Sequence, residues 1–179
     1  DTLNYSAITS QVAVNLGLGS TGLAANLDGA QEVPIRNTTA TATATISNYN
    51  ALTKTFDIAI TVSNLDPLNV TGFHIHRAPF GVNGPIIIDF MGVAPLVPSG
   101  TGFTFNATGL SIATSLLGGP ANEAAFLGGN TYVNIHTPTF PGGEIRGQVF
   151  TNGNVNLTSG TATGTGGVSN VENAIGGTA

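Results

Sequence analysis

Three histidines are the residues of this sequence whose type and spacing could do chemistry. His74 and His76 stand two positions apart in Gly72-Phe73-His74-Ile75-His76, and His136 is the only other histidine. Side chains alternate between the two faces of a β-strand, so His74 and His76 are expected to point the same way. Neutral imidazole is the commonest ligand of zinc and copper, and three ligands with an open position suit either metal. The spacing therefore predicts one copper or zinc ion bound by His74, His76 and His136.

A structural interpretation of the same residues stays open. No sequence rule brings His136 within reach of the histidine pair, and a His-x-His strand by itself is a weak signal. In this interpretation the histidine pair joins Glu144 and Arg146 in a hydrogen-bond and ion-pair network within a β-sandwich. Glu144 and Arg146 are expected on one side of their strand. We expect both of them, together with Asn134, to support the histidine strands rather than to react.

The composition limits the classes of partner. The chain has 179 residues, enough for one domain with a sizeable core. Charged residues make up only 7% and the net charge is −5. Four Lys and Arg residues cannot form the basic stripe that phosphate binding needs, so a nucleic-acid partner is excluded. The absence of cysteine rules out disulfides and thiolate sites, and no apolar run approaches the length of a membrane span.

The elements that must position the histidines are predicted to be strands. Threonine alternates with alanine in residues 38–48, and apolar residues alternate in residues 55–65, so these two strands should pair antiparallel. Residues 116–127 hold the one expected helix, with Pro120 at its start. Glu32, in the loop that follows the Asp28-Gly29 turn, is expected to be exposed rather than hydrogen-bonded to a nearby loop. The chain as a whole is predicted to be an all-β, Greek-key β-sandwich.

An enzymatic function is neither predicted nor excluded. The sequence contains no Gly-x-Ser-x-Gly elbow, phosphate-binding loop or cysteine nucleophile. The carboxylates Asp89, Glu123 and Glu144 show no paired spacing typical of glycosidases. A metal held by three histidines, with one position open, could still activate water or oxygen.

The central part of the chain, residues 23–150, resembles the chordin-type (CHRD) domain. Five motifs in the same order carry the resemblance: Leu27-Asp28-Gly29-Ala30-Gln31-Glu32-Val33-Pro34, Gly72-Phe73-His74-Ile75-His76, Asn83-Gly84-Pro85, Tyr132-Val133-Asn134-Ile135-His136-Thr137 and Gly143-Glu144-Ile145-Arg146-Gly147-Gln148. The resemblance implies an all-β extracellular domain whose biochemical role is poorly defined.

The strand Gly72-Phe73-His74-Ile75-His76 is also similar to the copper-ligand strand of copper/zinc superoxide dismutases. Those enzymes are Greek-key β-sandwiches and use more histidines than the three of this chain. The residues of a two-metal site are therefore lacking, and dismutase activity is not carried over. What the similarity implies is the strand motif and a single-metal site.

The two ends, residues 1–22 and 151–179, resemble segments found beside the calcium-binding β-rolls of repeats-in-toxin proteins. Val-Asn-Leu occurs in both ends, which favours a CHRD-like domain inserted into a β-roll-like segment whose two parts pair with each other or with a neighbouring unit. The nonapeptide Gly-Gly-x-Gly-x-Asp is absent, but Gly176-Gly177 read onward into Asp1 approximates it. We therefore predict head-to-tail copies of the chain with calcium at the junctions, near Asp1, Gly176 and Gly177.

Two functions follow from these observations. The first is an extracellular or cell-surface structural or adhesive module of a bacterium, repeated in a filament, sheath or surface layer and carrying a metal site. The alternative is a copper- or zinc-binding CHRD protein with a redox or storage role. Replacement of His76 by alanine separates them, because it should abolish metal uptake and leave assembly intact.

Overall fold

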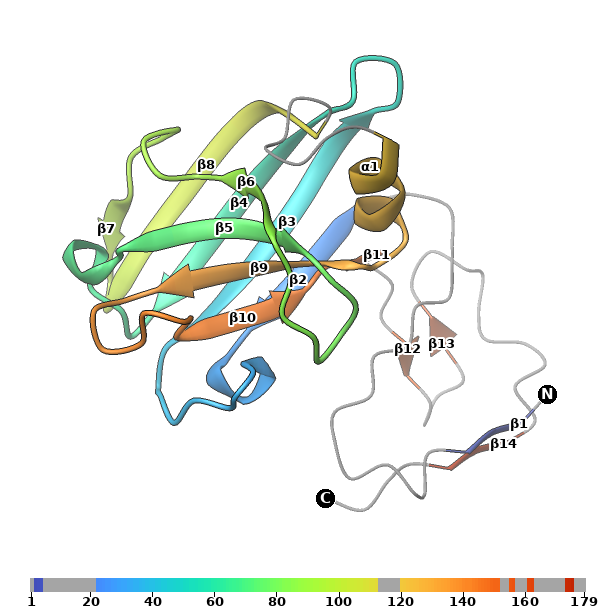
Figure 1. Cartoon of the computed structure of the whole chain (residues 1–179), viewed down its shortest axis with the longest axis horizontal. Helices are drawn as coiled ribbons and strands as arrows, with labels where there is room; N and C mark the ends of the chain where they lie inside the picture. Colours follow the sequence, from blue (N-terminus) through green and yellow to red (C-terminus); the bar gives the residue numbers. More distant parts are fainter. Residues whose placement is uncertain are drawn as a thin grey trace.

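A computed structural model shows two β-sheets packed face to face, with the four-stranded sheet in front of the six-stranded one in Figure 1. It describes residues 2–4, 22–112, 120–151, 155–156, 161–162 and 173–175. The six-stranded sheet has the order β11 (Phe150–Thr151), β2 (Leu23–Leu27), β3 (Thr41–Asn50), β4 (Thr55–Ser63), β8 (Gly102–Ser111) and β7 (Val97–Ser99). The four-stranded sheet has the order β10 (Ile145–Gln148), β9 (Thr131–His136), β5 (Gly72–Arg77) and β6 (Ile86–Asp89). The predicted β-sandwich is confirmed.

The six-stranded sheet follows directly from the alternation of its sequence. In β3 the residues Ala42, Ala44 and Ile46 are buried while the threonines between them are exposed. The strand pairs antiparallel with β4, as predicted, and Ile46 lies opposite Ile58. One face of the sheet therefore forms half of the core, and the other faces water.

The four-stranded sheet supplies the other half of the core. Phe73 and Ile75 of β5 and Val133 and Ile135 of β9 are fully buried on its inner face. The ring of Phe73 meets that of Phe105 from the six-stranded sheet edge to face, with 5.1 Å between ring centroids. Because neighbours along a strand point to opposite faces, burial of Phe73 and Ile75 places His74 and His76 on the outer face.

The predicted helix is confirmed as α1 (Pro120–Leu127), which lies at one end of the sandwich (Figure 1). Its Phe126 is buried against Phe56 of β4, with 4.7 Å between ring centroids. Glu123 pairs with Lys54 at 2.8 Å, so the helix is also tied to the β3–β4 hairpin. Two short 3-10 helices, η1 (Gly29–Gln31) and η2 (Pro67–Asn69), lie in the loops after β2 and β4.

Four short strands are described in the terminal segments. β1 (Thr2–Asn4) pairs in parallel with β14 (Asn173–Ile175), and β12 (Val155–Asn156) pairs with β13 (Thr161–Ala162). The backbone of the two ends thus meets, as Figure 1 shows. The division of the chain into an insert and β-roll-like flanks stays a prediction. Asp1, Gly176 and Gly177, the predicted calcium residues, lie outside the described residues.

Candidate metal centre

Antiparallel pairing of β5 with β9 brings the three histidines together. The register places Gly72 opposite His136, His74 opposite Asn134 and His76 opposite Tyr132. One ring nitrogen from each histidine lies within 4.8 Å of the others. The ring centroids of His74 and His136 are 5.0 Å apart. The pairing therefore supplies what the sequence alone could not, the approach of His136 to the His-x-His pair.

Two of the imidazoles are oriented by backbone carbonyl groups. His76 Nδ1 lies 2.9 Å from the Gly84 oxygen, and His136 Nδ1 lies 3.0 Å from the Pro141 oxygen. A carbonyl oxygen can only accept a hydrogen bond, so each Nδ1 carries the hydrogen and donates it. In a neutral imidazole the lone pair is then left on Nε2.

The third imidazole faces a carboxylate. His74 Nε2 lies 3.7 Å from Asp89 Oδ1, which also accepts a hydrogen bond from the Met91 backbone at 2.8 Å. This arrangement favours the hydrogen on Nε2 of His74 and the lone pair on Nδ1. A metal-ligating histidine usually donates the hydrogen on its other ring nitrogen to a carboxylate or a carbonyl, which is its outer partner.

The nitrogens left with lone pairs are also the ones that lack a protein partner. Among the described residues, His74 Nδ1, His76 Nε2 and His136 Nε2 are buried and have no hydrogen-bond partner in the protein. A buried acceptor without a partner costs about 1–3 kcal/mol. Three such acceptors, on rings that each bring a nitrogen within 4.8 Å of the others, can form a ligand set for a cation that prefers nitrogen.

Burial keeps two of the rings neutral. Removal from water, followed by the proximity of His74 and His136, lowers the pKa of His76 to about 4, although the hydrogen bond to the Gly84 carbonyl favours the charged form. Burial, followed by the proximity of His136, also lowers the pKa of His74 below its ordinary value. Both imidazoles are therefore unprotonated at neutral pH, the form that binds a metal.

Gly72 leaves the space that two of the rings occupy. A Cβ atom at this position would lie 2.8 Å from Cε1 of His74 and 3.2 Å from Cδ2 of His136. Any side chain would push these rings aside. The glycine of the His-x-His motif is thus part of the site's geometry.

The expected support by Arg146 has a different form from the predicted ion-pair network. The guanidinium group of Arg146 stacks on the ring of Tyr132, with 3.7 Å from Cζ to the ring centroid. The Tyr132 ring in turn stacks on His76 at 4.8 Å, with 6° between the ring planes. The carboxylate of Glu144 instead accepts hydrogen bonds from Thr137 at 2.6 Å and from Thr38 at 2.7 Å.

Glu32 was expected to be exposed, and this expectation is wrong. Only 3% of Glu32 is exposed, because the loop after β2 folds back over the outer face of the four-stranded sheet. Burial raises the pKa of Glu32 to about 7, although Arg146, Arg36 and a hydrogen bond with Asn134 favour the charged form. Asn134, predicted as a supporting residue, lies here beside Glu32 and opposite His74.

Sequence reasoning missed Asp89, Tyr132 and the two carbonyl acceptors. Asp89 reaches His74 through the pairing of β5 with β6, whose register is shifted between Ile75 and His76. No sequence pattern shows such a shift. The position of Tyr132 two residues before Asn134 and four before His136, on the same strand face, was the one available signal.

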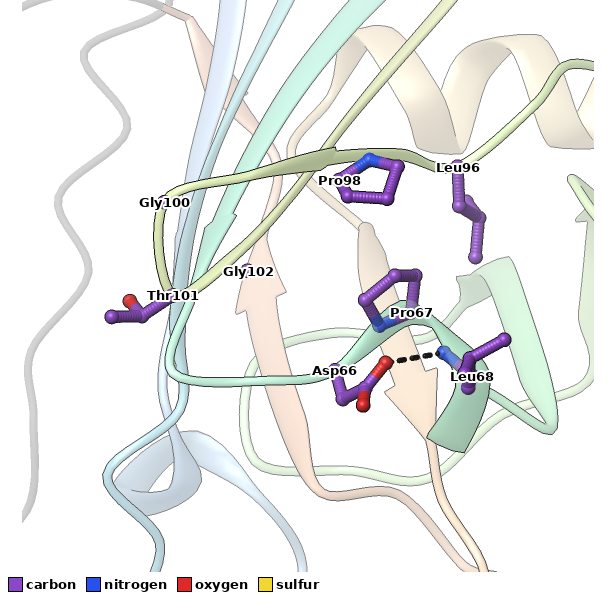
Figure 2. Close-up of a pocket in the computed structure, with 8 residues that line it drawn as sticks. All are labelled: Asp66, Pro67, Leu68, Leu96, Pro98, Gly100, Thr101 and Gly102. Carbon is purple, nitrogen blue, oxygen red and sulfur yellow. Dashed lines mark hydrogen bonds between the residues drawn. The ribbon is translucent and has the colours of Figure 1, made fainter.

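A hollow of about 560 Å³ lies between the loop after β4 and the β7–β8 hairpin. Figure 2 shows its lining of prolines, leucines and glycines, and none of the histidines contributes to it. Its carboxylate, Asp66, accepts a hydrogen bond from the Leu68 backbone at 2.9 Å. That carboxylate already caps η2, so the hollow presents no converging reactive groups.

Fold and site together define a β-sandwich domain with a buried polar cluster on one sheet. Residues 23–149, more than half of the chain, match the CHRD domain family, and the chain belongs to this family. Searches of curated proteins and of solved structures found no match. No helix in the described part of the chain has the length and apolar character to cross a membrane.

Proposed function

We propose that the chain binds one copper or zinc ion through His74 Nδ1, His76 Nε2 and His136 Nε2. The observation that carries the proposal is that one ring nitrogen of each histidine lies within 4.8 Å of the others, while Nδ1 of His76 and of His136 donates to a carbonyl and Nε2 of His74 faces Asp89. Carbonyl or carboxylate partners fix the tautomer that directs each lone pair at the ion.

The structural interpretation accounts less well for this geometry. A histidine that serves only the fold is expected to satisfy its buried nitrogens with protein partners. Here Nδ1 of His76 and Nδ1 of His136 are hydrogen-bonded, whereas the other nitrogen of each ring and Nδ1 of His74 are buried without a protein partner among the described residues. A bound cation satisfies all three at once.

The composition limits what else can coordinate the ion. The sequence has only three histidines and no cysteine, so any fourth ligand from the chain would have to be an oxygen. Structural zinc sites are usually closed by four protein ligands, whereas sites with three keep a position for water or another small ligand. Such an ion would supply Lewis acidity or, as copper, electron transfer, which suits a storage or redox role outside the cell.

The test is metal uptake by the purified metal-free chain, measured by inductively coupled plasma mass spectrometry and by competition with a chelator. We expect about one copper or zinc ion per chain in the wild type and loss of uptake in His76→Ala and His136→Ala. Asn106→Ala, an exposed change on β8, serves as the control. Equal uptake by the wild type and the histidine variants, or none by the folded wild type, would overturn the proposal.

A structural module that assembles head to tail is a second proposal. It is supported by the parallel pairing of β1 with β14, which brings the two ends together, and by the edge strands β6 and β7. We expect oligomers or filaments in sedimentation and electron microscopy, strengthened by calcium and retained in His76→Ala. A monomer at all concentrations, with or without calcium, would contradict it.

A further inference from the structure

Arg146 is a charged side chain in a place where a charge is costly. It is 1% exposed and is among the largest fully buried side chains of the described chain. No carboxylate forms an ion pair with it among the residues that the structure describes, although Glu32 is close enough to favour its charge. Burying an ion costs several kcal/mol unless hydrogen bonds and nearby charges offset it. An apolar side chain would fill this position at a lower cost, so the contacts of Arg146 are of interest.

One set of contacts reaches the edge of the His76 ring. The guanidinium group donates hydrogen bonds to Asn83 Oδ1 at 3.1 Å and to the Val82 oxygen at 2.9 Å. The next residue, Gly84, supplies the carbonyl that accepts from His76 Nδ1. Arg146 thus holds the backbone segment that determines which nitrogen of His76 carries the hydrogen.

A second set of contacts reaches the face of the same ring. The guanidinium plane covers one side of Tyr132, and His76 stacks on this tyrosine at 4.8 Å. The Tyr132 hydroxyl also accepts a hydrogen bond from the Gly84 backbone at 3.2 Å. Arg146, Tyr132 and residues 82–84 therefore enclose His76 on its face and its edge.

We propose that Arg146 is a positioning residue that fixes the orientation and tautomer of His76. The consequence for metal affinity rests on the proposed function, but the orientation of the ring does not. His74 and His136 have separate partners, Asp89 and the Pro141 carbonyl. The effect of Arg146 should therefore be selective for one histidine of the three.

The first experiment needs no metal. Two-dimensional ¹⁵N–¹H spectra of the metal-free chain report the tautomer of each histidine, and assignment uses the single histidine variants. In the wild type we expect His76 with its hydrogen on Nδ1. In Arg146→Met we expect a mixture of His76 tautomers with the His136 tautomer unchanged. In Arg146→Lys we expect the wild-type tautomer of His76 to be partly restored. Lys54→Met, which removes a cation at the α1 end of the sandwich, is the matched control.

The second experiment measures Cu²⁺ affinity by chelator competition. Removal of an outer partner of a metal ligand typically lowers affinity about 10–100-fold, and we expect Arg146→Met to fall in this range. Arg146→Lys should lose less, because it keeps the charge but lacks the planar fork that stacks on Tyr132 and bonds two oxygens. Lys54→Met should bind as the wild type does.

Asn83→Ala is a second variant that tests the same contact if Arg146→Met does not fold. Asn83 is exposed, and its loss removes one bond between Arg146 and the loop while the stack on Tyr132 remains. We expect partial loss of the single His76 tautomer and a few-fold weaker Cu²⁺ affinity. Wild-type tautomers in the folded variants would overturn the inference. Wild-type protein that binds neither Cu²⁺ nor Zn²⁺ would instead overturn the proposed function, and the tautomer measurement would still decide the role of Arg146.

Discussion

The outer faces of the two sheets differ in what covers them. In β3 of the six-stranded sheet, the outward residues Thr41, Thr43 and Thr45 are exposed, and this face needs no further partner. In β9 of the four-stranded sheet, every residue from Thr131 to Ile135 is buried, although Tyr132 and Asn134 point away from the core. A sheet that is buried on both faces usually has apolar residues on both.

The second face of the four-stranded sheet is instead polar and covered by loops. It carries the histidines, Tyr132, Asn134 and Arg146, beneath loops that contribute Glu32, Gly84 and Pro141. Polar groups are costly to bury, and several here have no hydrogen-bond partner in the described protein. The two sheets therefore differ in what their burial encloses: an apolar core on one face, and on the other a polar cluster that we propose as a binding site. Four substitutions test this comparison.

The largest effect is expected on the inner, apolar face. Phe73 is fully buried between Phe90 and Phe105, and Phe73→Ala should lower the free energy of unfolding by about 3–5 kcal/mol. Thr43→Ala, on the exposed face of β3, should change it by less than about 0.5 kcal/mol. Urea unfolding of the metal-free chain measures both, and equal losses would break the comparison.

Burial of Glu32 on the polar face should make the free energy of unfolding depend on pH. The pKa of Glu32 is about 7 in the folded chain against an ordinary 4.5, so the folded state holds a proton that the unfolded chain releases in this interval. The contribution of Glu32 to the free energy of unfolding is therefore fully present below pH 4.5. It is lost as the pH rises through 7, and the loss is at most about 3 kcal/mol.

Glu32→Gln isolates this contribution. The histidines contribute a pH dependence of the opposite sign, because the lowered pKa of His76 makes the fold less stable as the pH falls from 6.5 towards 4. Wild type and Glu32→Gln share the histidines, so the difference between their unfolding free energies should reflect Glu32 alone. We expect the wild type to lose stability relative to the variant between pH 4.5 and 8. A constant difference would show that Glu32 titrates as an exposed residue does.

A smaller effect is expected where the backbone leaves room for the histidines. Gly72→Ala should displace the rings of His74 and His136 and weaken Cu²⁺ binding about tenfold, or about 1.4 kcal/mol. At Gly142 an added Cβ would meet Arg36 at an ordinary 3.5 Å, so Gly142→Ala is the matched control. Chelator competition compares the two variants, and similar affinities would argue against a close fit at Gly72.

The smallest effect is expected at Asp89. Its side chain is about half exposed and lies 3.7 Å from His74, so solvent weakens the interaction. Asp89→Asn keeps an oxygen for the Met91 backbone but removes the charge behind His74. We expect Cu²⁺ affinity to fall less than about tenfold and the His74 ¹⁵N shifts to move more than those of His76. A loss as large as that of His76→Ala would make Asp89 a ligand rather than an outer partner.

Much of the fold could be predicted from local patterns. The alternation in residues 38–48 and 55–65 predicted the pairing of β3 with β4, and Pro120 marked the start of α1. The CHRD motifs predicted the family over nearly the same residues that match it. The similarity of the His-x-His strand to superoxide dismutases, and of the ends to β-roll flanks, stays a prediction.

The candidate site was predictable only in part. The period of two in a strand placed His74 and His76 on one face, and His136 was included for its residue type. Glu32 was misjudged because burial of a loop residue depends on what the loop folds against. The structural interpretation placed Glu144 and Arg146 in one network with the histidine pair, and the sequence did not show that each of the two side chains makes its hydrogen bonds outside its own strand.

The sequence by itself determined the strands, their two faces and the three imidazoles, because side-chain alternation is a property of neighbouring residues. Only the tertiary structure decided that the three rings meet, which nitrogen of each is free and which loops cover them. Those features depend on the register between β5 and β9 and on carbonyls of residues distant along the chain. Register and loop closure are set by packing over the whole domain, and no local period of the sequence encodes them.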